Sequence, residues 1–106
     1  MKAIQIITTV PTRILARKLA RLLVAQKIAA CVQIAGPIES VYHWKGKQEV
    51  TKEFLCSIKT RKSLFHVVER TIQRMHPYKV PEIIAVPVTA VSRSYVLWLQ
   101  KETRSR

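Results

Sequence analysis

The 106-residue sequence contains no Asp and only two glycines, at positions 36 and 46. Glycine-rich loops that cradle phosphate groups are therefore excluded, as are catalytic sites built from two adjacent aspartates. The two cysteines, Cys31 and Cys56, are too few for a disulfide framework. No stretch reaches the roughly 20 apolar residues of a membrane-spanning helix, and the first 12 residues lack the parts of a signal peptide. We therefore expect a cytoplasmic protein with reduced thiols.

Apolar residues and positive charge are abundant instead. Hydrophobic residues make up 48% of the chain, enough for a buried core, and 19 Lys and Arg stand against six Glu, for a net charge of +13. The length fits a single domain, residues 1–106. Because a domain of this size buries only about 60–70% of its unfolded surface, self-association would add useful burial.

Three segments have the pattern of helices. In residues 13–26, leucines recur at helical spacing, and a row of arginines occupies every fourth position on another face. Residues 63–75 have apolar side chains at spacings of three and four, and a short last helix is predicted over residues 93–102. Thr12 is suited to cap the first helix, and Pro77 ends the second.

Four segments have the pattern of strands, and they cover residues 4–10, 29–44, 47–59 and 83–88. Lys45 and Gly46 separate the second and third as a two-residue hairpin turn would. Gly36 and Pro37 predict a bulge or kink inside the second strand. Pro87 lies inside the fourth, which places that strand at a sheet edge.

The element order β-α-β-β-α-β, followed by an extra C-terminal helix, is typical of the α+β ferredoxin-like fold. From right-handed crossovers we predict that the first and third strands lie parallel to each other in the centre of the sheet. The second and fourth strands are then its edges.

The predicted hairpin is too long for its helical cover. Helices of about 13 residues cover about 20 Å, which a strand of about six residues matches. Most of the hairpin beyond Pro37 must therefore overhang the helices, and it carries Ile38, Val41, Tyr42, Trp44, Val50 and Phe54. An apolar hairpin with an open edge aggregates in water, so we predict that sister chains bury it.

The turn position also predicts the register of this hairpin. Glu39 then faces Lys52, an opposite-charge pair that stabilises the pairing. Cys56 faces Ala35, which places Cys31 about 13 Å away along the neighbouring strand. That separation is too long for a disulfide, and a bulge that shifts the register by one residue would not close it.

Five separated motifs carry a family resemblance. They are Ala-Ala-Cys-Val at 29–32, Ser-Val-Tyr-His-Trp-Lys-Gly-Lys at 40–47, Ile-Lys-Thr at 58–60, His-Pro-Tyr-Lys-Val-Pro-Glu-Ile-Ile at 76–84 and Tyr-Val-Leu-Trp-Leu at 95–99. In this order they resemble the CutA family of divalent-cation tolerance proteins over nearly the whole chain. The resemblance implies a ferredoxin-like subunit, a homotrimer built by strand pairing of long hairpins, and a link to copper and other divalent cations. The resemblance implies no catalytic activity, and the architecture is also similar to that of the PII signalling trimers.

Metal ligands of the soft or imidazole type are few, and no pair of them has the spacing of a known site. His76 is the best candidate, because it closes a helix beside the rigid Pro77 and by resemblance lies near a subunit boundary. Cys31 is the second metal candidate. Both Cys31 and Cys56 also fit the role of small core residues.

A pocket between subunits is the second candidate site. Its residues are the polar and aromatic members of the family-like motifs: Tyr42, Trp44, Lys59, Tyr78, Glu82, Tyr95 and Trp98. Aromatic rings with one Lys and one Glu can hold a small ligand. The same rings can instead lock the trimer by burying area while their polar tips find partners.

The function predicted from the sequence is that of a non-enzymatic homotrimer in divalent metal binding, tolerance and homeostasis. One alternative is a basic module for nucleic acid or another polyanion, because a charge of +13 attracts phosphates. No nucleic-acid-binding motif supports that alternative. A second alternative is a small-molecule sensor of the PII type. No paired carboxylates, and no Cys beside a base, indicate an enzyme.

Overall fold

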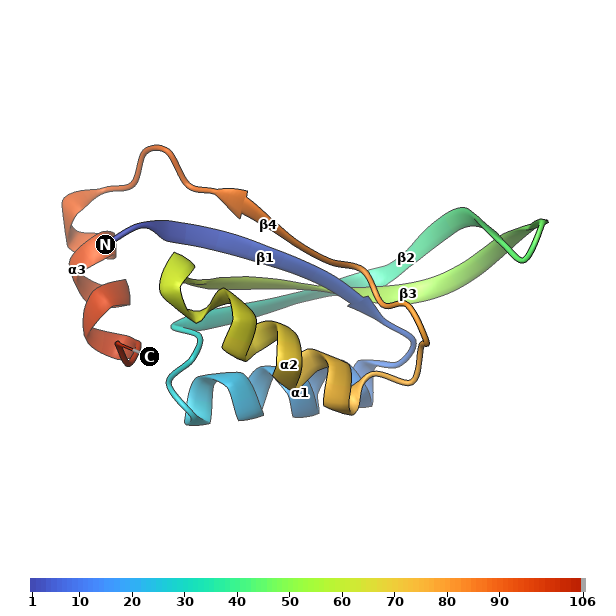
Figure 1. Ribbon diagram of the computed structural model, residues 1–106, viewed down its shortest axis with the longest axis horizontal. Coiled ribbons are helices and arrows are strands. Elements are labelled where there is room, and N and C mark those ends of the chain that lie inside the picture. Colours follow the sequence, from blue (N-terminus) through green and yellow to red (C-terminus); the bar gives the residue numbers. More distant parts are fainter. Residues whose placement is uncertain (106) are drawn as a thin grey trace.

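The computed structural model describes residues 1–105 and confirms the predicted order of elements (Figure 1). The elements are β1 (Ala3–Val10), α1 (Arg13–Ala25), β2 (Cys31–Trp44), β3 (Lys47–Arg61), a 3-10 turn (Lys62–Leu64), α2 (Phe65–Met75), β4 (Ile83–Pro87) and α3 (Arg93–Glu102). The second helix begins two residues later than predicted, because the 3-10 turn precedes it and Ser63 caps nothing.

The four strands form one sheet in the order β2-β3-β1-β4. The predicted edges, β2 and β4, are confirmed, but the prediction of parallel central strands is wrong: β1 and β3 pair antiparallel. The crossover through α1 makes β2 run parallel to β1, and the hairpin then reverses β3, which inserts between them. Every neighbouring pair in the sheet is therefore antiparallel.

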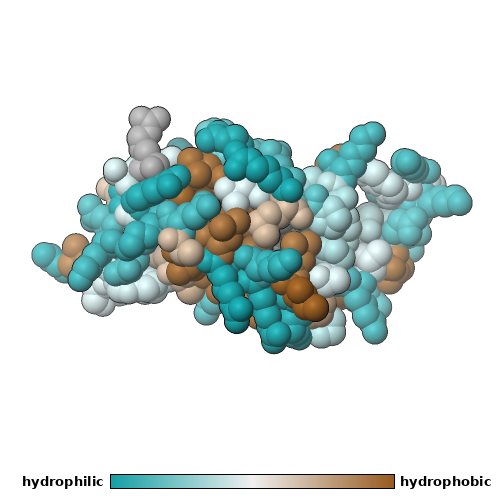
Figure 2. Space-filling view, turned by 90° about the horizontal axis from the view of Figure 1, so that it is seen from below, coloured by the Kyte–Doolittle hydropathy of each residue, from teal (hydrophilic) through white to brown (hydrophobic). Residues whose placement is uncertain are grey.

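Both long helices cover the same face of the sheet (Figure 1). Thr12 caps α1 as predicted, and its Oγ1 accepts a hydrogen bond of 3.1 Å from the backbone N–H of Leu15. The fully buried side chains between helices and sheet include Ile6, Leu19, Leu23, Ile58, Val68 and Ile72. Each of these contributes about 1.5–3 kcal/mol by leaving water. On its outer side the helical layer shows hydrophilic side chains interspersed with apolar ones (Figure 2).

The hairpin turn and the register between the turn and the bulge agree with the prediction from the sequence. Lys45 and Gly46 have φ of 52° and 78°, as a type I′ turn requires, and Glu39 pairs with Lys52. The register shifts between Ala35 and Ile38, so Cys56 faces Ile34 and not Ala35 as predicted. Both cysteines are free thiols, as expected.

The far half of the hairpin extends beyond the helices, along the 45 Å long axis of the molecule (Figure 1). Val41 and Val50 pair with each other and are 59% and 57% exposed, and Trp44 is 40% exposed. Phe54 is better covered, since it packs against the core and lies 4.8 Å below the Arg13 guanidinium. The predicted apolar overhang is thus confirmed for its outer part.

The last helix closes the opposite end of the sheet. The Arg61 guanidinium donates hydrogen bonds of 2.9 Å to Thr103 Oγ1 and 2.8 Å to the Gln100 carbonyl, and these bonds anchor the C-terminal end of α3 to β3. Leu99 of α3 is buried, and Lys27 forms an ion pair of 3.5 Å with Glu102. No helix in the described residues is long and apolar enough to cross a membrane.

Candidate functional site

A cavity of about 760 Å³ lies between the hairpin and the segment that joins α2 to β4. It is lined by Thr9, Ser40, Val41, Tyr42, Trp44, Glu49, Glu53, Tyr78, Lys79, Val80 and Glu82. Three aromatic rings and three carboxylates therefore meet around one hollow, a mixture typical of ligand sites.

His76 holds the connecting segment in place. Its Nε2 lies 2.6 Å from the Thr9 carbonyl oxygen, and its Nδ1 accepts a hydrogen bond of 3.1 Å from the backbone N–H of Tyr78. Since Nε2 must donate and Nδ1 must accept, these contacts select the neutral imidazole with its proton on Nε2. The ring also packs on Tyr78, with centroids 4.6 Å apart, so His76 positions a wall of the cavity. A metal ion at either nitrogen would have to displace one of these hydrogen bonds.

The lining of the cavity is acidic on balance, because it contains three carboxylates and one ammonium group, that of Lys79. Glu53 is only 5% exposed, and no basic residue in the described chain forms an ion pair with it. Burial raises the pKa of Tyr78 to about 12, and the neighbouring Glu53 carboxylate adds to the shift because it disfavours a second negative charge. Half of the six carboxylates of a strongly basic chain thus line one hollow.

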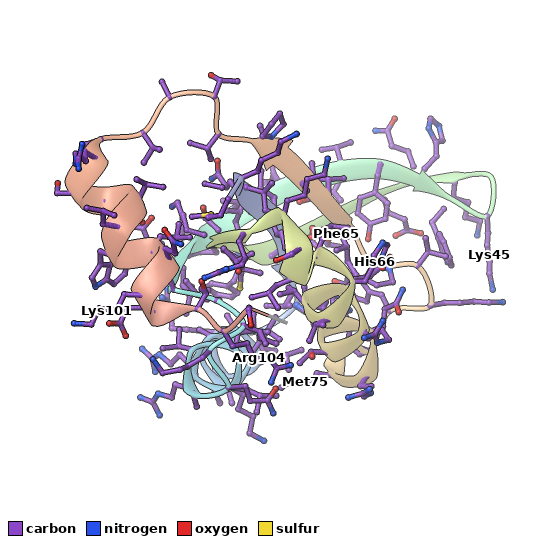
Figure 3. All side chains as sticks on the ribbon, turned by 60° about the vertical axis from the view of Figure 1, so that its left-hand side comes forward. Lys45, Phe65, His66, Met75, Lys101 and Arg104 are labelled. Carbon is purple, nitrogen blue, oxygen red and sulfur yellow. The ribbon has the colours of Figure 1, made fainter. Side chains whose placement is uncertain are left out.

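The structure divides the seven predicted pocket residues into two groups. Tyr42, Trp44, Tyr78 and Glu82 line the cavity, whereas Lys59, Tyr95 and Trp98 do not. The Lys59 ammonium donates to Gln33 Oε1 and to Ser57 Oγ, and Tyr95 packs on Trp98 with centroids 5.4 Å apart on α3. Figure 3 shows how far apart α3 and the hairpin tip lie, with Lys101 and Lys45 labelled on them. Among residues 1–105, Lys59 and Glu82, the one Lys and the one Glu of this predicted set, form no ion pair with each other.

Glu49 and Glu53 are cavity residues that the sequence analysis missed. Tyr42 faces Glu49 and Ile38 faces Glu53 across the hairpin, so both carboxylates lie on the same face as Tyr42 and Trp44. The register predicted from the turn already contained this information, because residues that alternate along paired strands share a face.

The two metal candidates are separated within one subunit. Cys31 pairs with Lys59, whereas Thr9, which contacts His76, pairs with Leu55. Four residues along β3 correspond to about 13 Å. Over residues 1–105, no three side chains of His, Cys, Asp or Glu approach closely enough to hold a metal ion. The metal roles of His76 and Cys31 stay predictions.

The two thiols should differ in reactivity. Cys56 is fully buried, and burial raises its pKa from 9.0 to about 11, whereas Cys31 is partly exposed. We expect alkylation of the native protein at pH 8–9, read by mass spectrometry, to label Cys31 first and Cys56 only after unfolding. Because the folded-state pKa of Cys56 lies above its unfolded value, its contribution to the unfolding free energy should be complete below pH 9 and decline towards pH 11. Equal labelling rates in the folded protein would contradict this assignment.

Comparison with known proteins identifies the family that this chain resembles. The family of the CutA1 divalent ion tolerance protein matches residues 4–102. The chloroplastic protein CutA of Arabidopsis thaliana is 45% identical over 103 residues, which are 97% of this chain and 57% of that protein. The divalent-cation tolerance protein CutA of Thermus thermophilus is 37% identical over 92% of this chain and 95% of its own length.

Solved structures of the same family have the same fold. The crystal structure of CutA1 from Oryza sativa superposes with a TM-score of 0.97 at 39% identity and covers 100% of this chain and 97% of that one. CutA1 from Thermus thermophilus superposes with a TM-score of 0.93 at 35% identity over 96% and 99% of the two chains. The chain spans little more than half the length of the two plant proteins in the curated comparison, 57% and 58%. These matches establish that the chain belongs to the CutA1 divalent ion tolerance protein family.

Proposed function

We propose that the protein is a homotrimer that binds copper or another divalent cation and serves metal tolerance and homeostasis without being an enzyme. Membership of a divalent ion tolerance family supports the metal, and the relative from Thermus thermophilus carries that function in its name. The observation that carries the proposal is that this family matches residues 4–102 of the chain.

The exposed hairpin supports the proposed assembly. Its outer part leaves Val41, Trp44 and Val50 in water, next to the open edge of β2. Strand pairing between subunits would satisfy that edge and cover these side chains together. We propose three subunits because hairpin pairing around a threefold axis is what the family resemblance implies.

Trimer formation would also complete the predicted pocket. One half, Tyr42, Trp44, Tyr78 and Glu82, lies beside the hairpin, and the other half, Lys59, Tyr95 and Trp98, lies towards α3. A hairpin that reaches across a neighbouring subunit would bring the two halves together. The cavity volume of about 760 Å³ and its aromatic rings also suit a small organic ligand, which favours a PII-like sensor as the second candidate function.

The metal site needs ligands from more than one subunit. One subunit gathers no three suitable side chains in the described residues, whereas stable sites for copper use several imidazole or thiolate ligands. We propose that His76 and Cys31 contribute from different subunits. A cytoplasmic location belongs to the same proposal, since both cysteines are free. Relatives from Arabidopsis thaliana and Archaeoglobus fulgidus are named as chloroplastic and periplasmic proteins.

Copper titration followed by calorimetry tests the metal proposal. We expect saturable binding below about 1 mM copper, and weaker binding in His76→Ala and in Cys31→Ser. His66→Ala is the matched control, because His66 is an exposed imidazole on α2 whose Nδ1 contacts Glu69 at 3.1 Å, away from the cavity. Absence of saturable binding, or equal weakening by His66→Ala, would reject these ligands.

A further inference from the structure

Positive charge is distributed unevenly over this protein. The hairpin segment 38–53 carries three Lys and three Glu and is neutral overall. The segments 13–25 and 62–75, which form the helical layer, carry seven basic residues and one acid. The helical layer therefore carries +6 of the net charge of +13, whereas the hairpin segment carries none.

Five exposed cations make up what we call the basic helical face: Arg17, Lys18 and Arg21 on α1, and Arg70 and Arg74 on α2. None of them has a carboxylate partner, since the ion pairs of the described residues are Lys27–Glu102 and His66–Glu69. Arg13 is different, because its guanidinium donates to the Gly36 carbonyl and covers Phe54.

This arrangement is unfavourable for the isolated chain. Arg17 and Arg21 are four residues apart on one helix, as are Arg70 and Arg74 on the other, and like charges at this spacing destabilise a helix by about 0.2–0.5 kcal/mol per pair. Neither helix carries an acidic residue in its first turn. A polyanion bound across the helices would remove this repulsion.

We propose that the basic helical face docks on the phosphate backbone of double-stranded nucleic acid without reading its sequence. Four of the five cations are arginines, whose planar guanidinium matches the phosphate group with two hydrogen bonds. Residues four apart rise by about 6 Å along a helix, so each helix presents a short row of such groups. In the proposed complex these rows contact phosphates.

The scarcity of stacking side chains on this face favours the duplex over single strands and lipid surfaces. Among Phe, Tyr and Trp, α2 contains only Phe65, which is partly buried against the core, and α1 contains none. The exposed imidazole of His66 on α2 is paired with Glu69. Single strands are bound by stacking of bases on aromatic side chains, and lipid surfaces by helices with aromatic anchors. The Trp and Tyr side chains of this protein instead lie on the hairpin, the connecting segment and α3.

Docking by this face is independent of the proposed metal site and compatible with the proposed trimer. Assembly through the hairpins and strand edges would leave the helical layer on the outside. Three such faces on one particle would raise the apparent affinity for a long duplex by multivalency.

The test is fluorescence anisotropy with a labelled DNA duplex of about 20 base pairs, at several salt concentrations and with EDTA present. EDTA removes metal ions, so the outcome is independent of copper binding. We expect the native protein to bind, with an affinity that falls steeply as salt rises. The double variant Arg17→Gln/Arg21→Gln should bind about tenfold more weakly and reduce the slope of log affinity against log salt by about 1.8.

Lys45→Gln/Lys47→Gln is the matched control, because it removes the same charge from the hairpin tip, and it should leave the slope unchanged. Arg17→Lys/Arg21→Lys should keep most of the salt dependence and shows whether the helix tolerates substitution. Equal weakening by the helix and hairpin pairs would overturn the proposal, as would undetectable duplex binding. Binding to phosphatidylserine vesicles in preference to the duplex would also overturn it, in favour of a lipid surface.

Discussion

Trp44→Glu is expected to dissociate the proposed trimer. Trp44 lies next to the hairpin turn, beyond the helical cover, and 40% of it is exposed in the single subunit. Sister chains would cover this ring in the assembly, so a carboxylate in its place would leave water at each of three interfaces, where Lys47 faces it across the hairpin. Desolvation of a charge costs several kcal/mol and pairing with one lysine offsets only part of that cost, so the loss is large beside the stability of a small domain. Size-exclusion chromatography with light scattering should show monomers or misfolded aggregates.

Gln48→Glu is the matched control for charge. It adds the same carboxylate near the hairpin tip, on the other face, where Gln48 pairs with His43. Trp44→Phe controls for the loss of the indole, because it keeps an aromatic ring. Both variants should elute as the native protein does. A Trp44→Glu protein that still elutes as an unchanged trimer would contradict packing of the hairpin tip between subunits.

The local elements were predictable because each depends on neighbouring residues. Helical spacing of leucines predicted α1, Thr12 capped it, and the Lys45-Gly46 pair formed the turn. The pairing of Glu39 with Lys52 followed by counting outwards from that turn. Beyond the bulge the count failed by one residue, since a bulge adds an unpaired residue whose effect on the register is not determined by the local pattern. The predicted parallel direction of the two central strands was wrong, because the prediction did not include the reversal of β3 by the hairpin.

The candidate site was predictable only in part, because a cavity depends on which distant segments meet. Tyr42, Trp44, Tyr78 and Glu82 belong to motifs, and they do line one hollow. Glu53 was missed although the predicted register places it on the same face as Tyr42 and Trp44. The register does not predict its burial, which depends on packing between the hairpin and the connecting segment. Lys59, Tyr95 and Trp98 would join the cavity only through a second subunit, so their predicted pocket role belongs to the proposed trimer.

Gly36→Ala is expected to have the largest effect on folding. Gly36 lies in the bulge of β2 with a φ of +151°, which side chains of L residues rarely allow. A Cβ there would lie 2.7 Å from Cδ2 of Phe54, closer than real Cβ contacts, and 3.0 Å from the carbonyl oxygen of Glu53, tighter than most of them. Phe54 packs against the core and supports the Arg13 guanidinium, so it has little freedom to move. Steric crowding and backbone strain each cost about 1–3 kcal/mol, and we expect the free energy of unfolding to fall by about 3 kcal/mol.

Gly46→Ala separates the two causes of that loss. Gly46 also has a positive φ, +78°, but a Cβ there would meet nothing within 4 Å. This variant therefore carries the backbone strain alone, about 1–2 kcal/mol. Urea denaturation of both variants at the same chain concentration measures the difference, since the stability of an assembled protein depends on concentration. If the two variants lose equal stability, Phe54 does not confine the bulge. A larger loss for Gly36→Ala would show that close packing of Phe54 against the bulge, and not the φ angle alone, requires glycine at this position.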